Sequence, residues 1–256
     1  VVISEDTDVL ILLLHHANTS NKKIYLTSEP KASSKTPPKL WDIVDTKKCI
    51  GSITCKNILA IHALLGCDTT SRIHGIGKGM ALKKFENDSN FREKLSIFDD
   101  PNQEVEEISK SGEFLVSMLY GANEGIDLGL LRYTTFSKRL ATSKKFITPE
   151  VLPTSDAVKW HSLRVYHQVQ TWKSVNLNVE EWGWVVKGNL LLPKLMSQPA
   201  GPAELITIIR CNCTGDCGTG RCSCNKNKMK CSPMCGICKG VTCLNHQERD
   251  VEHLNN

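Results

Sequence analysis

The residues best suited to chemistry are nine cysteines near the C-terminal end of the 256-residue chain. Zn²⁺ prefers four thiolate ligands in a tetrahedron, and an odd number of thiols cannot all pair as disulfides. The spacing therefore predicts a zinc site. Three zinc ions fit if three sulfurs each bridge two ions, and two zinc ions with one spare thiol are the alternative. The nine are Cys211, Cys213, Cys217, Cys222, Cys224, Cys231, Cys235, Cys238 and Cys243.

Three aspartates form a second candidate metal site. Asp6 and Asp8 follow the apolar start of the chain, and Asp68 follows an apolar run that ends at Leu65. We expect residues 1–14 to form a buried parallel strand, on which side chains two residues apart share a face. Carboxylates at the carboxyl end of such a strand suit Mg²⁺. The three aspartates are therefore predicted to bind a metal ion; the alternative for the first two is a surface turn solvated by water.

A glycine-rich corner lies between two helical patterns, with Gly75, Gly77 and Gly79 separated by Ile76 and Lys78. Glycine permits positive φ and close approach of the backbone to a ligand. The helix that follows begins with unpaired N–H groups that attract anions, and Lys78, Lys83 and Lys84 add positive charge. This stretch predicts a helix–hairpin–helix that binds a phosphodiester backbone irrespective of sequence. A plain loop between two helices is the alternative.

The elements that must position these residues indicate an α/β fold. It combines a parallel sheet with a helix–hairpin–helix, a helical extension and a small zinc-cluster module. We expect three parts: residues 1–140, a helical connector over 141–205 whose aromatics dock on the body, and a cysteine module over 206–246. Expected elements are strands at 22–27, 41–45 and 184–187, a helix capped by Ser52 or Thr54, helices over 112–120 and 128–140 and one from Ser155, and a helical break at Asp100-Pro101.

Part of the chain resembles a known nuclease family. Ser4-Glu5-Asp6-Thr7-Asp8, then Leu65-Gly66-Cys67-Asp68 and Ile73-His74-Gly75-Ile76-Gly77-Lys78, looks like the second half of a flap-endonuclease-type, PIN-like nuclease domain. The resemblance covers residues 1 to 90. It implies that the three aspartates are catalytic, that they share two Mg²⁺ ions with further carboxylates, and that the hairpin tracks a duplex. In that family the further carboxylates lie upstream of the equivalent of Asp6, so we expect an N-terminally truncated, inactive fragment.

The cysteine region is similar to the CXC domain of the Tesmin family and to the pre-SET cysteine region of the enhancer-of-zeste type. All nine cysteines and the closing Asn245 have counterparts. Tesmin-type proteins bind DNA through paired repeats, with a tyrosine just before the second C-x-C. Here the repeat is single and Arg221 stands at that position. Because arginine also enters a narrow minor groove, Arg221, Lys226 and Lys228 are predicted DNA contacts.

Charge and composition are compatible with a nucleic-acid partner. The chain carries a net charge of +5 and has a pI near 8.5. The cysteine region itself has six basic residues against Asp216, a net +5 that three zinc ions and nine thiolates reduce to +2. This charge predicts weak, salt-sensitive DNA contact. The longest apolar run, residues 9–14, is far too short to cross a bilayer. Dense thiols without an export pattern predict a reducing compartment, and we expect the nucleus.

Taken together, these features predict a metal-dependent, structure-specific nuclease-like protein that binds duplex or branched DNA and carries a zinc-cluster DNA-binding tail. One alternative is a non-catalytic DNA- or chromatin-binding protein that retains a degenerate nuclease fold. Another is a zinc-stabilised protein-interaction module. The combination of a nuclease-like region with a single CXC module also suggests, by resemblance, a gene family related to mobile elements.

Overall fold

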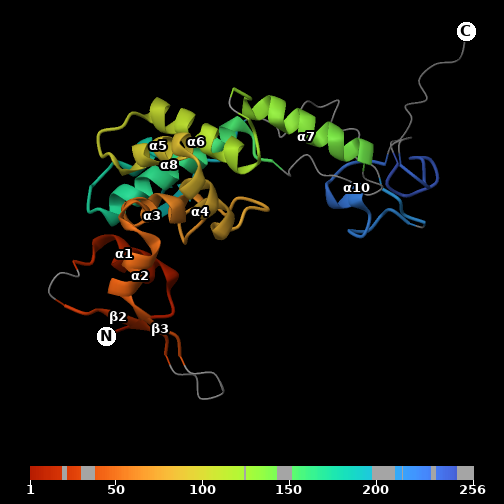
Figure 1. Ribbon diagram of the computed structural model, residues 1–256. Coiled ribbons are helices and arrows are strands. Elements are labelled where there is room, and N and C mark those ends of the chain that lie inside the picture. The colour runs from red at the N-terminus through yellow and green to blue at the C-terminus, as the bar shows by residue number, and fades with distance from the viewer. Residues whose placement is uncertain are drawn as a thin grey trace, which may run out of the picture. The chain divides into compact units, whose positions relative to one another are not determined.

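The computed structural model describes residues 1–18, 22–29, 38–123, 125–142, 152–197, 211–214, 216–231 and 235–246 (Figure 1). The chain forms two compact units. The first comprises Val1–Leu128 and Ser155–Met196, and the second comprises Gly129–Thr154 and Ser197–Asn256. The structure is thus a mixed helix and strand protein with a small sheet and a separate cysteine-rich unit. The division at residues 140 and 205 stays a prediction.

A three-stranded sheet opens the first unit, in the order β1-β2-β3. β1 (Val2–Ile3) and β2 (Tyr25–Thr27) pair in parallel, with Val2 opposite Leu26. β3 (Leu40–Asp42) pairs with β2 in the antiparallel sense. The sheet is therefore mixed, and the prediction of a parallel sheet is correct for its first pair of strands only.

The apolar run after Asp8 is helical, so the prediction of a strand over residues 1–14 is wrong beyond Ile3. Helix α1 spans Thr7–His16, and the side chain of Asp6 caps it by accepting a hydrogen bond from the backbone N–H of Asp8 at 2.8 Å. The run is rich in leucine, which favours a helix more than β-branched residues do. Its residue Leu14 packs with Leu26, Ile43 and Ile58 in a core that ties α1 to the sheet.

Helix α3 (Ser52–Leu64) is the most deeply buried element of this unit, and it contacts α1 and α8. It follows α2 (Ile43–Ile50) after a single residue, Gly51. Gly51 is the N-cap of α3, with no side-chain hydrogen bond at the cap. Ser52 is thus the first helical residue and Thr54 is buried, so neither residue has the capping role that the sequence suggested.

Further helices complete the first unit: α4 (Lys78–Asn87), α5 (Ser89–Ser96), the short η1 (Ile97–Asp99) and α6 (Val105–Leu119). The predicted break at Asp100-Pro101 lies in the turn between η1 and α6. Helix α6 packs along α8 (Ser155–Trp172), and a Cβ at Gly112 of α6 would lie 2.4 Å from the Cβ of Ser162. Only glycine permits so close an approach of these two helices.

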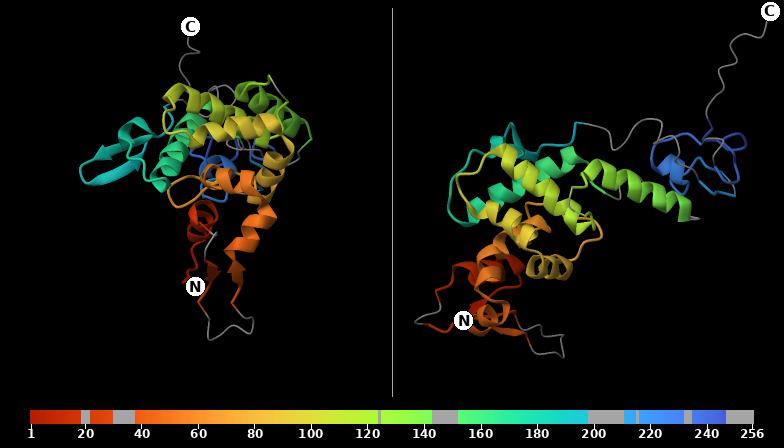
Figure 2. Two further views of the ribbon diagram at one scale, coloured as in Figure 1. Left: turned by 60° about the vertical axis from the view of Figure 1, so that its left-hand side comes forward. Right: turned by 45° about the horizontal axis from the view of Figure 1, so that its top comes forward.

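Aromatic contacts hold the segment after α8 against that helix. The rings of Tyr166 and Trp182 lie 4.4 Å apart between centroids, next to η3 (Val179–Glu181). The chain then forms a strand hairpin, β4 (Trp184–Lys187) and β5 (Leu190–Pro193), in which Gly188-Asn189 forms the turn after the predicted strand. The left view of Figure 2 shows this hairpin standing out from the helices of its unit.

The second unit contains α7 (Leu128–Thr142, whose first residue is assigned to the first unit) and the cysteine module with its single turn of helix, α10 (Ser223–Lys226). The buried cluster of the module consists of cysteine side chains, with Met229 packed against them. A segment this short is too small to build an ordinary apolar core, and sulfur takes the place of one. Among the described residues, no helix has both the length and the apolar character needed to span a bilayer.

Candidate functional site

The carboxylates of Asp6 and Asp8 lie at the start of α1, not on one face of a strand. Asp6 is the N-cap and is exposed, whereas Asp8 is in the first helical turn with 20% of its side chain exposed. Both follow the carboxyl end of β1, which is the edge of the sheet where the sequence placed them. The cap geometry therefore explains why the two are neighbours, although the expected strand alternation does not exist.

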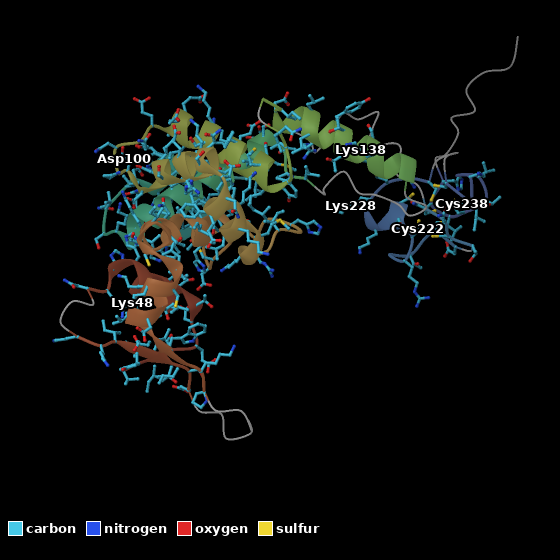
Figure 3. All side chains as sticks on the ribbon, viewed as in Figure 1. Lys48, Asp100, Lys138, Cys222, Lys228 and Cys238 are labelled. Carbon is cyan, nitrogen blue, oxygen red and sulfur yellow. The ribbon has the colours of Figure 1, made fainter. Side chains whose placement is uncertain are left out.

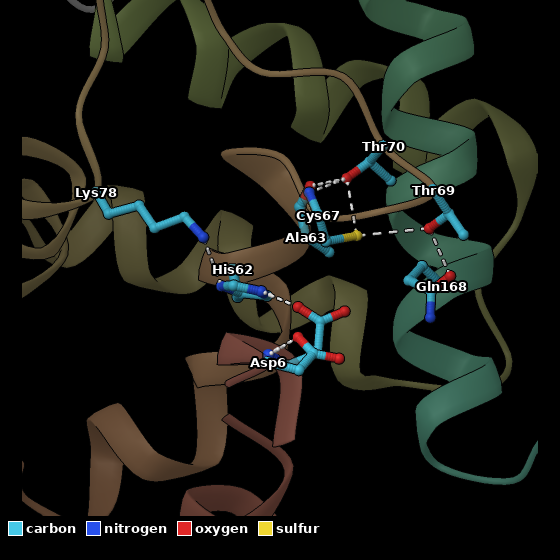
Figure 4. A network of polar contacts seen from close by, with 9 residues as sticks. Asp6, His62, Ala63, Cys67, Thr69, Thr70, Lys78 and Gln168 are labelled. Atoms are coloured by element: carbon cyan, nitrogen blue, oxygen red, sulfur yellow. Dashed lines mark hydrogen bonds and ion pairs between the residues drawn. The ribbon is translucent and has the colours of Figure 1, made fainter. Parts of the chain in front are cut away.

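Asp8 belongs to a network that crosses three helices (Figure 4). The Nε2 atom of His62, on α3, lies 2.6 Å from Oδ1 of Asp8, and Nζ of Lys78, the first residue of α4, lies 2.9 Å from Nδ1 of the same ring. A carboxylate can only accept and an ammonium can only donate. Nε2 of His62 therefore carries the ring proton and donates it in a hydrogen bond to Asp8. Nδ1 accepts a hydrogen bond from the ammonium of Lys78.

The His62 ring at the centre of this network is buried. The His62 side chain is 3% exposed, and its ring centroid lies 6.0 Å from that of Trp172 on α8. Burial lowers the pKa of Lys78, while the negative charge of Asp8 acts in the opposite direction. The ring of His62 is fixed because both of its nitrogens are engaged.

The structure does not bring Asp68 into a shared ligand set with Asp6 and Asp8. Asp68 is exposed in the connection between α3 and α4. Among the described residues, the groups of three or more potential ligand atoms that lie within 4.8 Å of one another consist of cysteines alone. The side chains around Asp68 engage elsewhere: Thr69 donates to Gln168 at 2.6 Å, and Thr70 donates to the carbonyl of Ala63 at 2.6 Å. Asp68 therefore forms no such compact group with Asp6 and Asp8, and its role at a shared metal site stays a prediction.

The glycine corner is present, but only one of its three glycines uses positive φ. Gly75 has φ +74°, Gly77 is the N-cap of α4 with φ −93°, and Gly79 lies within the helix. Of the three positions, Gly75 is therefore the one whose backbone conformation favours glycine. The helix does begin without a side-chain cap, as an anion seat requires.

The three lysines of the corner differ in their surroundings. Lys83 is exposed, whereas Lys84 forms an ion pair with Asp88 at 2.8 Å and Lys78 points to His62. Of the three, Lys83 is therefore the predicted phosphate contact whose ammonium has no ion-pair or hydrogen-bond partner among the described residues. The other two would have to exchange an internal partner for a phosphate.

The cysteine module brings all nine predicted ligands together, and every cysteine of the chain is free of disulfide bonds. Four overlapping groups of four cysteines each have all their Sγ atoms within 4.8 Å. Neighbouring sulfurs lie 3.7 to 3.9 Å apart. A tetrahedron with Zn–S bonds of about 2.3 Å has an edge of about 3.8 Å, so the cluster could hold zinc. The groups are Cys211, Cys231, Cys235 and Cys238; Cys211, Cys222, Cys224 and Cys231; Cys211, Cys213, Cys217 and Cys222; and Cys217, Cys231, Cys238 and Cys243.

The surroundings of the sulfurs require a cation if they are to ionise together. Burial raises the pKa of Cys211, Cys217 and Cys231, and raises that of Cys224 to about 12. Burial also acts on Cys222, but hydrogen bonds, first that of the Asn225 backbone, outweigh it and lower the pKa of this thiol to about 7. Zn²⁺ supplies the charge that makes several buried thiolates compatible with one another.

Asn245 holds one of these sulfurs in place. Its side-chain amide lies 3.5 Å from Sγ of Cys231 and donates to the carbonyl of Met229 at 2.7 Å. The backbone carbonyl of Asn245 accepts a hydrogen bond from the backbone N–H of Cys231 at 2.6 Å. This explains why the motif closes on an asparagine, since an amide N–H orients a ligating sulfur from behind.

The predicted DNA contacts of the module are all exposed. Arg221 precedes the second C-x-C, Lys226 ends α10, and Lys228 follows with φ +55°; the last of these is labelled with Cys222 and Cys238 in Figure 3. Lys230 and Lys239 are exposed as well. Their roles remain predictions, and their positions leave the ammonium and guanidinium groups accessible to a polyanion.

His62 is a site residue that the sequence pattern does not indicate, since a lone histidine within a helix is usually interpreted as a satisfied core or surface residue. It is buried and hydrogen-bonded, so the structural part of that interpretation is correct. Its partners lie 54 residues before it and 16 residues after it, and no short motif links residues at such distances. A histidine within a helix between two candidate site segments was the one available signal.

Comparison with known proteins gives no relatives from which a role could be transferred. No protein-family model, curated protein or solved structure matches the chain. We therefore infer function from the geometry of the two sites.

Proposed function

We propose that the chain is a DNA-binding protein whose C-terminal module is organised by a cluster of three zinc ions and nine cysteine thiolates. The observation that carries the proposal is the set of sulfur separations of 3.7 to 3.9 Å, which match the edge of a zinc–thiolate tetrahedron. Disulfides would need sulfurs about 2 Å apart.

The distances also indicate which sulfurs would bridge. Cys211, Cys222 and Cys231 lie within 4.8 Å of one another, as the three bridges of a triangular cluster must. The other six then supply two terminal ligands to each ion. Cys213 and Cys217 would be one such pair, since they form a group with Cys211 and Cys222, and Cys224, Cys235, Cys238 and Cys243 would supply the other four places.

The charge of the module supports DNA as its partner. Residues 211–246 carry five basic side chains and one acidic side chain, Asp216. With three zinc ions and nine thiolates the net charge is +1, so the affinity comes from local placement of cations and not from a large net charge. Arg221 directly precedes the ligand Cys222, and Lys228 lies between the ligands Cys224 and Cys231, so zinc binding would order both.

Duplex binding with and without zinc tests this proposal. A fluorescent duplex is titrated with zinc-loaded protein in several salt concentrations, and again after chelation, with anisotropy as the readout. We expect salt-sensitive binding that is lost on chelation and restored by zinc. Lys48→Gln is the control variant, because Lys48 is an exposed lysine of the other unit, and we expect it to bind the duplex as the wild-type protein does. Binding that is unchanged after zinc removal would contradict the proposal.

A second candidate function is Mg²⁺-dependent cleavage of phosphodiesters at the start of α1. Mg²⁺ usually takes one or two carboxylates and completes its shell with water and substrate phosphates. Asp6 and Asp8 suit that donor set, and His62 uses only Oδ1 of Asp8 for its hydrogen bond. When bound, the ion would activate water and stabilise the leaving oxygen. Asp68 would have to approach with the substrate.

The residues of this chain would bind and orient the substrate. The ammonium of Lys83 and the uncapped N–H groups at the start of α4 would bind the backbone phosphates of a duplex. Cleavage of a branched duplex that requires Mg²⁺ and is lost in Asp8→Asn would support this second function. Undiminished cleavage by that variant would exclude it.

A further inference from the structure

We propose that His62 is a positioning residue that holds Asp8 and Lys78 on opposite sides of one imidazole ring, so that both groups act on a single phosphodiester. The inference rests on the second candidate function. It adds a residue from α3 to the site at the start of α1, and it gives Lys78 a role different from duplex tracking.

The first step is the fixed orientation of the Asp8 carboxylate. The 2.6 Å contact from Nε2 of His62 to Oδ1 is a short hydrogen bond to a charged acceptor. It leaves Oδ2 as the oxygen that can turn toward a cation. Carboxylate ligands of metal sites are commonly oriented by such a partner, and losing the partner costs about 10- to 100-fold in metal affinity.

The second step is the position of the Lys78 ammonium. Nζ lies 2.9 Å from Nδ1 of His62, so it is separated from Asp8 by one ring. Lys78 is also the first residue of α4, where the uncapped N–H groups of the helix lie. A phosphate oxygen bound by this ammonium and these N–H groups would thus lie beside the carboxylate.

The third step is the energetic cost of the arrangement. His62 is 3% exposed, and a buried imidazole whose nitrogens had no hydrogen-bond partners would destabilise the fold. Both nitrogens are instead satisfied by groups at the surface of the site, and the ring cannot rotate without losing one of them. Packing alone would be served equally well by an apolar side chain at this position, which would leave Asp8 and Lys78 unlinked.

Two near-isosteric variants separate the two contacts. In His62→Gln the amide can still donate to Asp8 from the position of Nε2, but the acceptor for Lys78 is lost. In His62→Asn the side-chain oxygen can still accept from Lys78 at the position of Nδ1, but the donor to Asp8 is lost. The probe is Mn²⁺, whose affinity for the zinc-loaded protein is measured by water-proton relaxation with and without a short duplex.

We expect the wild-type protein to bind Mn²⁺ and to bind it more tightly when the duplex is present. His62→Asn should weaken Mn²⁺ binding about 10- to 100-fold. His62→Gln should keep the affinity without duplex but lose the enhancement. Lys78→Gln, at an exposed position that does not threaten folding, should behave as His62→Gln does. The matched control is His74→Gln, an exposed histidine of the same connection.

Two results would overturn the proposal in distinguishable ways. If wild-type protein binds Mn²⁺ and both His62 variants match it with and without duplex, the positioning role is wrong while the metal site stands. If wild-type protein binds no Mn²⁺ at all, the second candidate function fails and this inference fails with it. Should the His62 variants fail to fold, Lys78→Gln decides, because an unchanged duplex enhancement in that variant excludes the linkage.

Discussion

Lowering the pH should destabilise the first unit through one buried histidine, His161 of α8. Its Nε2 donates to the carbonyl of Leu64 at 2.9 Å, at the end of α3, and its Nδ1 is buried without a partner among the described residues. Burial lowers the pKa of His161 to about 4; the hydrogen bond to Leu64 opposes this shift, and Arg164 reinforces it. The neutral ring is therefore the form that the fold accepts.

The direction and size of the effect follow from this pKa. Above pH 6.5 the ring is neutral in both folded and unfolded chains, so no stability is lost. Between pH 6.5 and about 4 the unfolded chain takes up a proton that the folded chain does not, and stability falls with falling pH. The full loss is about 3 kcal/mol, since each pH unit of difference corresponds to about 1.4 kcal/mol.

Urea unfolding followed by tryptophan fluorescence at pH 7 and pH 4 measures this loss. The informative quantity is the free energy of unfolding of wild type minus that of His161→Gln, in which the amide can donate to Leu64 but cannot take up a proton. Release of zinc at low pH affects both proteins and cancels. We expect the difference to shift by about 3 kcal/mol against wild type. If the difference between wild type and His161→Gln does not change with pH, the reasoning is refuted. For the control His74→Gln, at an exposed histidine, we expect no such change with pH.

Further predictions concern packing, zinc and DNA. Gly112→Ala should destabilise the first unit by about 1–3 kcal/mol in urea unfolding, because its Cβ would meet Ser162, and adding Ser162→Gly should restore most of the loss. Cys231→Ser should lower the number of zinc ions per chain, measured by mass spectrometry, more than substitution of a terminal cysteine does, because a bridging sulfur binds two ions. Arg221→Gln combined with Lys228→Gln should reduce the magnitude of the salt slope of duplex binding by about 2; an unchanged slope would exclude them as phosphate contacts.

The cysteine module was the part of the protein most open to prediction from sequence. A metal cluster is specified by ligands whose spacing is visible along the chain, and all nine cysteines of residues 211–243 gather as expected. The strand at residues 184–187 and the helix that begins at Ser155 were also predicted, since strand-forming residues and caps are local signals, whereas β5, the partner of that strand, was not predicted.

Other features depend on tertiary structure that the local pattern does not specify. The run over residues 9–14 is apolar throughout, and periodicity cannot distinguish a buried strand from a buried helix in so short a segment. The side chain of Asp6 stabilises the helical form, because it accepts a hydrogen bond from the N–H of Asp8 in the first turn. His161 and Arg164 are polar residues of α8, but the helix is packed on several sides and buries both. The contacts of His62 could not be predicted, because they join three helices through side chains far apart in the sequence.

The most direct test of the account is the number of zinc ions per chain, measured by native mass spectrometry of the intact protein. Nine thiolates in a bridged triangle predict three zinc ions, and titration of the zinc-free protein should reach saturation at that number. Saturation at two ions with one thiol still reactive toward an alkylating reagent would contradict the bridged cluster. An absence of bound zinc would contradict the proposed module as a whole.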